Sequence, residues 1–175
     1  MMAMADNDDV VNWLTGVDLD AMVLRNADAD TRAAFLGVFS ANTLPLQCNK
    51  LPALLIVNSD TANLDGQHWY AIHIAAGTGQ PEGELFDPLA LPQQFTPFLE
   101  SWLNSKTTNW IYNDIRVQHP LIPSCGAFVL HFVLNRLQYT TMKSYMLQSF
   151  FPAAAADDIV KNELLIRNYV SGLLK

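Results

Sequence analysis

Cysteine is scarce in this 175-residue sequence, which contains only Cys48 and Cys125. Two cysteines cannot form the disulfide framework of a small secreted domain, so a reducing compartment is the better expectation. A secretory signal is also missing from the first residues, MMAMADNDDVV, which are acidic and lack a basic stretch followed by an apolar one. We therefore expect the protein to act inside a cell and not to be secreted.

Long hydrophobic runs and clustered positive charge are absent as well. No apolar run reaches the roughly 18 residues that a membrane span needs, so no membrane partner is expected. The ten Lys and Arg residues never occur side by side, and the net charge is −7. Because nucleic acids are bound through several cations at once, no nucleic-acid partner is expected either. With 50% hydrophobic and only 15% charged residues, the composition is typical of a compact domain with one sizeable core.

The order of the predicted elements indicates an α+β fold. Runs of aromatic and β-branched residues predict strands at 34–40, 53–59, 68–76, 83–88 and 109–118. Helices are predicted within the first 34 residues, with Asp18 as a candidate N-cap, and at 95–105, 125–137, 141–150 and the C-terminal end. We expect one domain over residues 1–175, with a small, mostly antiparallel sheet flanked by helices, and with C-terminal helices in 139–175.

Cys125 stands between a proline-rich loop and a long apolar run, in the stretch PLIPSCGAFVLHFVLNRL (120–137). The apolar run predicts a buried helix that begins at the cysteine. A lone cysteine in such a place can be a small hydrophobic core residue. Alternatively it can be a nucleophile, because the dipole at a helix N-terminus favours a thiolate. The other residues able to take part in catalysis distinguish these two interpretations.

A cysteine nucleophile needs a base, and four histidines are candidates. His131 lies six positions after Cys125, on the far side of the predicted helix, and is interpreted as a packing residue. His119 lies in the preceding loop and is interpreted as exposed. His68 opens a predicted strand and His73 follows five positions later, so the two point to opposite faces and only one can reach the site. The strand-end position favours His68.

An acid and an amide follow in an order that suits cysteine catalysis. Asp87 ends the strand predicted beside that of His68, where its carboxylate can accept a hydrogen bond from Nδ1 of the imidazole. Gln118 ends the strand before the cysteine loop, and its amide N–H groups suit an oxyanion beside the sulfur of Cys125. Each residue alone is ordinary, but their order and spacing are not.

The stretches GQHWYAIHI, ELFDPLALP and VQHPLIPSCGAFVLHFVL together resemble the adenovirus-type, or adenain-like, cysteine protease family. That family has His-Trp at a strand start, then Phe-Asp-Pro, then Val-Gln, six residues and Cys-Gly at a helix start. The resemblance covers residues 35–138 and implies a papain-like architecture. It implies four catalytic residues, with Cys125 as nucleophile, His68 as base, Asp87 orienting the base and Gln118 in the oxyanion hole.

The same resemblance implies a biological role. Trp69 and Gly126 occupy substrate-binding positions, and the enzyme is implied to be a maturation endopeptidase of a virus or virus-like mobile element. Its substrates would be viral structural precursors, cut near small residues and often after Gly, in the host nucleus or cytoplasm or in the virion. No cofactor and no metal are expected. Adenovirus enzymes are stimulated by DNA and by a peptide attached to a second cysteine, but the matching segment SKTTNWIYND (105–114) has none. Cys48 lies elsewhere and has no assigned role.

Two other functions remain open at this stage. A related class of peptidase removes ubiquitin-like modifiers and shares the His–Asp–Gln–Cys order, although a short chain leaves little surface to hold a folded partner. The second alternative is a protein without catalytic activity that keeps a protease fold as a component of a virion or scaffold. It is disfavoured because all four candidate catalytic positions have residue types able to catalyse the reaction.

Overall fold

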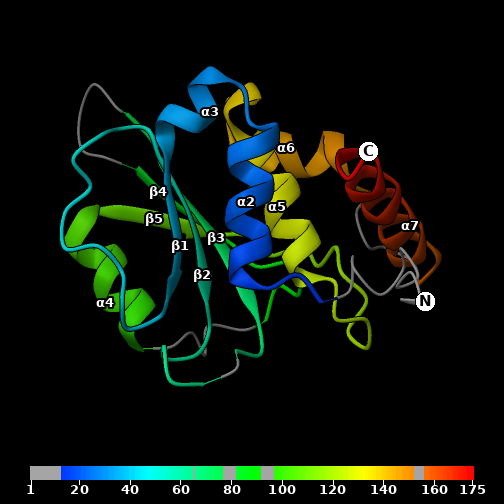
Figure 1. Cartoon of the computed structure of the whole chain (residues 1–175), viewed down its shortest axis with the longest axis horizontal. Helices are drawn as coiled ribbons and strands as arrows, with labels where there is room; N and C mark the ends of the chain where they lie inside the picture. The colour runs from blue at the N-terminus through cyan, green and yellow to red at the C-terminus, as the bar shows by residue number, and fades with distance from the viewer. Residues whose placement is uncertain (1–12, 65, 77–81, 92–96, 152–155) are drawn as a thin grey trace, which may run out of the picture.

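The sheet has five strands, and helices cover both of its faces (Figure 1). The computed structural model describes residues 13–64, 66–76, 82–91, 97–151 and 156–175. Its strands are β1 (Phe35–Ser40), β2 (Ala53–Asn58), β3 (Trp69–Ile74), β4 (Glu82–Phe86) and β5 (Asn109–Tyr112), and they lie in the sheet in chain order. The predicted α+β class is confirmed.

The pairing of the strands is mixed. β2–β3 and β3–β4 are antiparallel, as the short connections between those strands predict, but the two outer pairings, β1–β2 and β4–β5, are parallel. A parallel neighbour needs a connection that runs back along the sheet. Residues 41–52 provide it between β1 and β2, and helix α4 (Pro97–Lys106) provides it between β4 and β5. The prediction of a mostly antiparallel sheet is therefore wrong at both edges.

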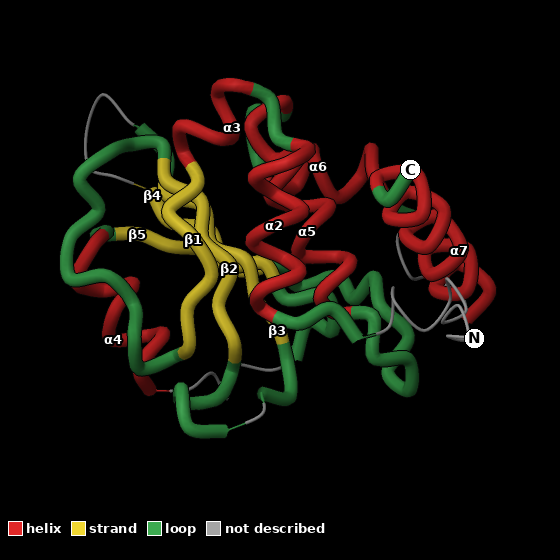
Figure 2. The backbone as a smooth tube through the Cα atoms, viewed as in Figure 1, coloured by secondary structure: helices red, strands yellow, loops and turns green. Residues whose placement is uncertain are grey.

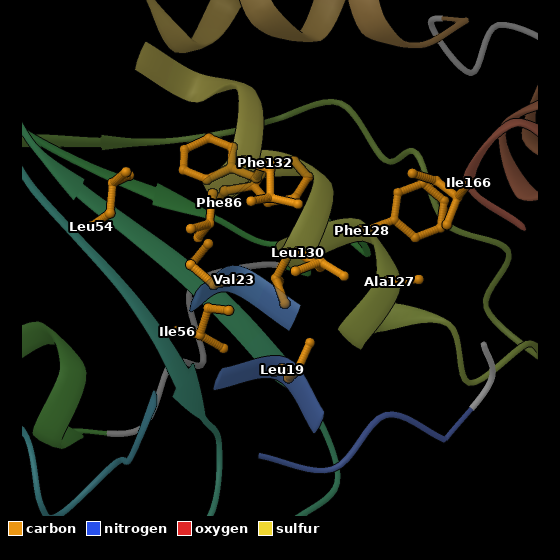
Figure 3. Packing of buried hydrophobic residues seen from close by; sticks show 14 of the residues in the cluster. Leu19, Val23, Leu54, Ile56, Phe86, Ala127, Phe128, Leu130, Phe132 and Ile166 are labelled. Atoms are coloured by element: carbon orange, nitrogen blue, oxygen red, sulfur yellow. The ribbon is translucent and has the colours of Figure 1, made fainter. Parts of the chain in front are cut away.

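Alternating side chains of the central strands enter two separate cores. Leu55 and Ile72 point to the face that α4 covers, with its Leu99 and Leu103. The opposite face packs against α2 (Gly16–Asn26) and α5 (Cys125–Asn135), and Figure 3 shows Leu19 and Val23 of α2 among the side chains of this second core.

Helix α5 is the centre of the molecule. Each of its residues from Cys125 to Leu134 is buried, because the sheet, α2 and the C-terminal helix α7 (Ala156–Leu173) all contact it. Figure 1 shows α7 on the outer side of α5, away from the sheet. Phe128 is fully buried in this core, and we expect Phe128→Ala to lower the free energy of unfolding by about 3–5 kcal/mol. The start of α5 is thus held in place from several directions.

The remaining elements follow the predictions with local differences. Thr15 caps α2, and Asp18 is its third residue, completing a capping box in place of the predicted cap at Asp18. The strand predicted over 109–118 ends at Tyr112. The other helices are α3 (Ala29–Ala34), η1 (Arg136–Gln138) and α6 (Met142–Ser149). The predicted stop at Pro152 lies outside the described residues. Among the described residues, no helix is long and apolar enough to cross a membrane.

Candidate active site

His68 and Asp87 meet at one end of the β3–β4 pair. His68 directly precedes β3 and Asp87 directly follows β4, and the antiparallel register brings these ends together. Ser59 holds the backbone of His68, because its N–H donates to the His68 carbonyl at 2.8 Å and its hydroxyl accepts from the His68 N–H at 3.2 Å. The imidazole Nε2 then lies 2.7 Å from Oδ1 of Asp87.

The orientation of the imidazole differs from the predicted one. Asp87 binds Nε2 of His68 and not Nδ1. The other ring nitrogen, Nδ1, is therefore the one left to interact with Cys125. Burial alone would lower the pKa of His68, but its interactions with the Asp87 carboxylate and the Cys125 side chain raise this pKa to about 9. At neutral pH the ring is mainly an imidazolium.

The Asp87 carboxylate is fully buried and held by several donors. Besides His68, its two oxygens accept the backbone N–H groups of Leu89 at 2.9 Å and Leu91 at 3.1 Å. The side chain of Asn113 fixes the Asp87 backbone, accepting from its N–H at 2.7 Å and donating to its carbonyl at 2.6 Å. A carboxylate held by this many donors cannot rotate away from the imidazole.

Cys125 is the first residue of α5 and is only 8% exposed. The residue before it, Ser124, occupies the N-cap position, yet its hydroxyl makes no capping hydrogen bond to the helix. Its carbonyl accepts from the N–H groups of Ala127 and Phe128. In the described part of the chain, the N–H groups of Cys125 and Gly126 have no backbone acceptor. Two donors of the first turn therefore remain free beside the sulfur.

Gln118 lies in the loop between β5 and α5 and not at the end of a strand as predicted. Figure 2 shows this loop beside the start of α5. Its backbone N–H donates to the carbonyl of Pro88 at 3.0 Å, which attaches this loop to the residue after Asp87. The buried side chain donates through Nε2 to the carbonyl of Ile122 at 2.6 Å, and its Oε1 has no partner among the described residues. One N–H of Nε2 remains for a ligand.

A groove of about 1050 Å³ opens at Cys125 and lies between α2 and β1. Trp69 and Gly126 are in its wall, together with Gly16. A methyl group added at Gly16 would come within 3.3 Å of the Trp69 indole, and one added at Gly126 within 3.5 Å. The indole is therefore packed between two glycines.

The other histidines lie elsewhere, as expected for two of them. His73 is buried and its Nδ1 lies 2.9 Å from Glu84, which also pairs with Arg136. His131 packs inside the core and bonds to the Tyr145 hydroxyl at 2.8 Å. His119, predicted to be exposed, is half-buried, with its backbone N–H bonded to Glu163 of α7. Asn113 and Glu163 gave no signal in the sequence, because isolated polar residues in a turn and on a helix are ordinary.

The fold is similar to that of known viral proteases. Two solved structures of the ASFV pS273R protease, one of them the selenomethionine form, superpose on this chain with TM-scores of 0.59 and 0.57. The similarity covers 91% of this chain and 68% and 69% of theirs, at 14% and 13% sequence identity. No protein-family model matches the sequence, and no curated protein matches it either. The chain thus has the fold of a viral cysteine protease.

Proposed function

We propose that this protein is a cysteine endopeptidase of the adenain type that processes viral precursor proteins. The observation that supports it most strongly is the convergence of Cys125, His68 and Asp87 from three separate segments, with the 2.7 Å His68–Asp87 hydrogen bond orienting the ring. Gln118 lies seven positions before Cys125, in the loop that ends at the start of α5.

The proposed reaction follows from this arrangement. The thiolate of Cys125, stabilised by the His68 imidazolium and the helix N-terminus, attacks the scissile carbonyl carbon. The carbonyl oxygen becomes an oxyanion, which the first-turn N–H groups and the Gln118 amide stabilise. The imidazolium then donates its proton to the leaving amine as the C–N bond breaks. Water, deprotonated by the neutral imidazole, hydrolyses the thioester and regenerates the enzyme.

The groove supports a preference for small residues. Because Trp69 lies against Gly16 and Gly126, large side chains next to the scissile bond would meet the indole. We propose cleavage near small residues, commonly after Gly, in viral structural precursors. We further propose that the enzyme acts in the host nucleus or cytoplasm or in the virion, without DNA or a membrane as partner.

Replacement of the four catalytic candidates tests the proposal. With a peptide that contains a Gly-rich cleavage site, Cys125→Ala and His68→Ala should abolish turnover. Asp87→Asn should leave residual activity, because the nucleophile and base remain. Gln118→Ala should lower kcat by about 10²–10³, the scale for one oxyanion donor. Loss of activity in His73→Ala with retention in His68→Ala would contradict the assignment of the base.

A substrate panel separates this function from the two alternatives. Cys48→Ala serves as the control for Cys125→Ala and should retain full activity. Cleavage of modifier-linked proteins but not of linear precursors would indicate a deconjugating peptidase. An unreactive Cys125 together with no cleavage of either substrate would indicate a protein that keeps the fold without the activity.

A further inference from the structure

A single carboxylate of the C-terminal helix contacts both ends of the segment that joins Gln118 to Cys125. Glu163 of α7 accepts the backbone N–H of His119 through Oε1 at 2.7 Å. It accepts the hydroxyl of Ser124 through Oε2 at 2.8 Å. His119 follows Gln118 and Ser124 precedes Cys125, so one side chain fixes the spacing of the two residues that would surround an oxyanion.

This contact also determines what the Ser124 side chain does. A serine at an N-cap position normally accepts a hydrogen bond from the second or third N–H of its helix. Here its hydroxyl donates to Glu163 and makes no such bond. The carboxylate thereby orients the serine away from the helix start, and the N–H of Gly126 stays available beside the sulfur.

Glu163 is buried, so the hydrogen bonds to its carboxylate are needed to offset the cost of removing it from water. Its side chain is only 4% exposed, and burial raises the pKa of this carboxyl, against the hydrogen bonds from His119 and Ser124 and the charges of Arg167 and His119. Burying a carboxylate is costly unless its oxygens are satisfied. Both oxygens of Glu163 are satisfied by the cysteine loop, and its neighbour Asn162 holds a different segment through Phe151.

We propose that Glu163 is a positioning residue for the Cys125 nucleophile, acting from α7 on the 119–124 segment. The inference rests on the proposed function. It makes the C-terminal helix part of the active-site scaffold, although none of the described side chains of that helix lines the groove beside Cys125. Removal of the carboxylate should leave substrate binding in the groove nearly unchanged and misplace the nucleophile and the oxyanion donors.

The experiment compares Glu163→Ala and Glu163→Gln with Asn162→Ala, all in a Cys48→Ala background that leaves one thiol. Glutamine has the shape of glutamate, but its single amide oxygen can accept a hydrogen bond from only one of the two donors. We therefore expect Glu163→Gln to retain more activity than Glu163→Ala. We expect kcat to fall about 10–100-fold for Glu163→Ala and less for Glu163→Gln, with KM within about threefold of the parent. The alkylation rate of Cys125 by iodoacetamide should fall in the same order.

Asn162→Ala controls for a loosened helix α7, since it also removes two hydrogen bonds that attach the helix to the chain. It should lower Tm and leave both rates unchanged. The inference is overturned if the Glu163 variants lose Tm as the control does while kcat and alkylation remain at the parent level. If the parent hydrolyses no peptide, the proposed function fails, and the alkylation rates still decide the role of Glu163. If Glu163→Ala does not fold, the Glu163→Gln measurement decides it.

Discussion

Cys125 and Cys48 lie in contrasting surroundings. Cys125 begins a helix and interacts with His68, whose pKa is raised to about 9. Cys48 lies half-buried in the loop between β1 and β2, where burial raises the pKa of its thiol against the charge of Lys106. A thiolate is the reactive form, so two thiols of one chain should differ greatly in reactivity.

Iodoacetamide labelling at about pH 6 measures this difference. We expect Cys125 to react much faster than Cys48 in the folded protein, with the difference lost in urea, where both are ordinary thiols. Mass spectrometry of labelled peptides at short times gives both rates from one sample. Equal rates in the folded state would remove the basis for assigning Cys125 as the nucleophile.

At the scale of elements, the start of α5 depends on a residue without a side chain. Gly126 is the second residue of the helix and faces Leu14, just before α2, and Trp69 of β3. A Cβ there would lie 3.2 Å from Cβ of Leu14 and 3.5 Å from Cδ1 of Trp69. Contacts this short would push the first turn away from its neighbours.

We expect Gly126→Ala to lower kcat/KM about tenfold or more, because a small displacement of the nucleophile reduces the fraction of reactive geometries. Its effect on stability should be small, since alanine favours a helix and offsets part of the crowding. Peptide hydrolysis and Tm measured together test both statements.

Gly172→Ala is the matched control, because an added Cβ in α7 meets nothing within 4 Å. It should leave kcat/KM unchanged and raise stability by at most about 1 kcal/mol. Equal kinetics for the two alanine variants would show that the close packing at Gly126 is not needed for catalysis.

At the scale of the whole molecule, buried titratable groups make stability depend on pH in separate ranges. His131 is surrounded by core, and burial lowers its pKa from 6.5 to about 4. Between these values the unfolded chain binds more protons, so stability falls as the pH falls. Burial alone would raise the pKa of Glu84, but hydrogen bonds from His73 and Arg136 lower it to about 2. Glu84 therefore changes the pH dependence of stability only below pH 4.5. His68, whose pKa is raised, contributes its full stabilisation below pH 6.5, and this stabilisation is lost as the pH rises toward 9.

Urea denaturation at pH 7 and pH 4.5 should therefore show a loss of about 2–3 kcal/mol from His131. The His131→Gln variant, whose side-chain amide can still form a hydrogen bond with the Tyr145 hydroxyl, should lose less stability over the same range. Glu163, with a raised pKa, has the opposite sign but contributes equally to both proteins. The same pH dependence in parent and variant would show that His131 is not responsible.

Charge distribution over the whole molecule predicts that duplex DNA does not stimulate the proposed peptidase activity. Net charge is −7, and the cations most available for a groove, Lys50, Lys106, Arg116 and Lys143, are distributed over α4, α6 and two different loops. Lys106 is also engaged by the carbonyl of Leu46. We expect DNA to change the peptidase rate by less than about twofold at physiological ionic strength.

A rate titration with duplex DNA at two salt concentrations tests this expectation. A large stimulation that weakens as salt rises would show that the folded chain gathers these cations into a groove. Net charge would then have been a poor guide to the local surface.

Local patterns in the sequence predicted the element types and proposed the residues of the candidate site. Short runs of aromatic and β-branched residues predicted β1 to β4, and the apolar segment 125–137 predicted the buried helix that begins at Cys125. The separation of five positions between His68 and His73 placed them on opposite faces, and His73 does lie with Glu84 instead of near Cys125. These inferences held because they depend on local geometry, which successive residues fix among themselves.

The contacts between distant segments follow from the packing of the whole chain and not from the local sequence. Several features have no local signature in the sequence. They are the parallel edges of the sheet, the hydrogen bond of Asp87 to Nε2 of His68, the position of Gln118 in a loop, and the contacts of Asn113 and Glu163. Glu163 is 44 residues from His119 and 39 from Ser124. Such pairs meet only when the chain packs around α5, because the position of a helix on the core is set by the burial of its apolar face and not by the residues beside it in sequence.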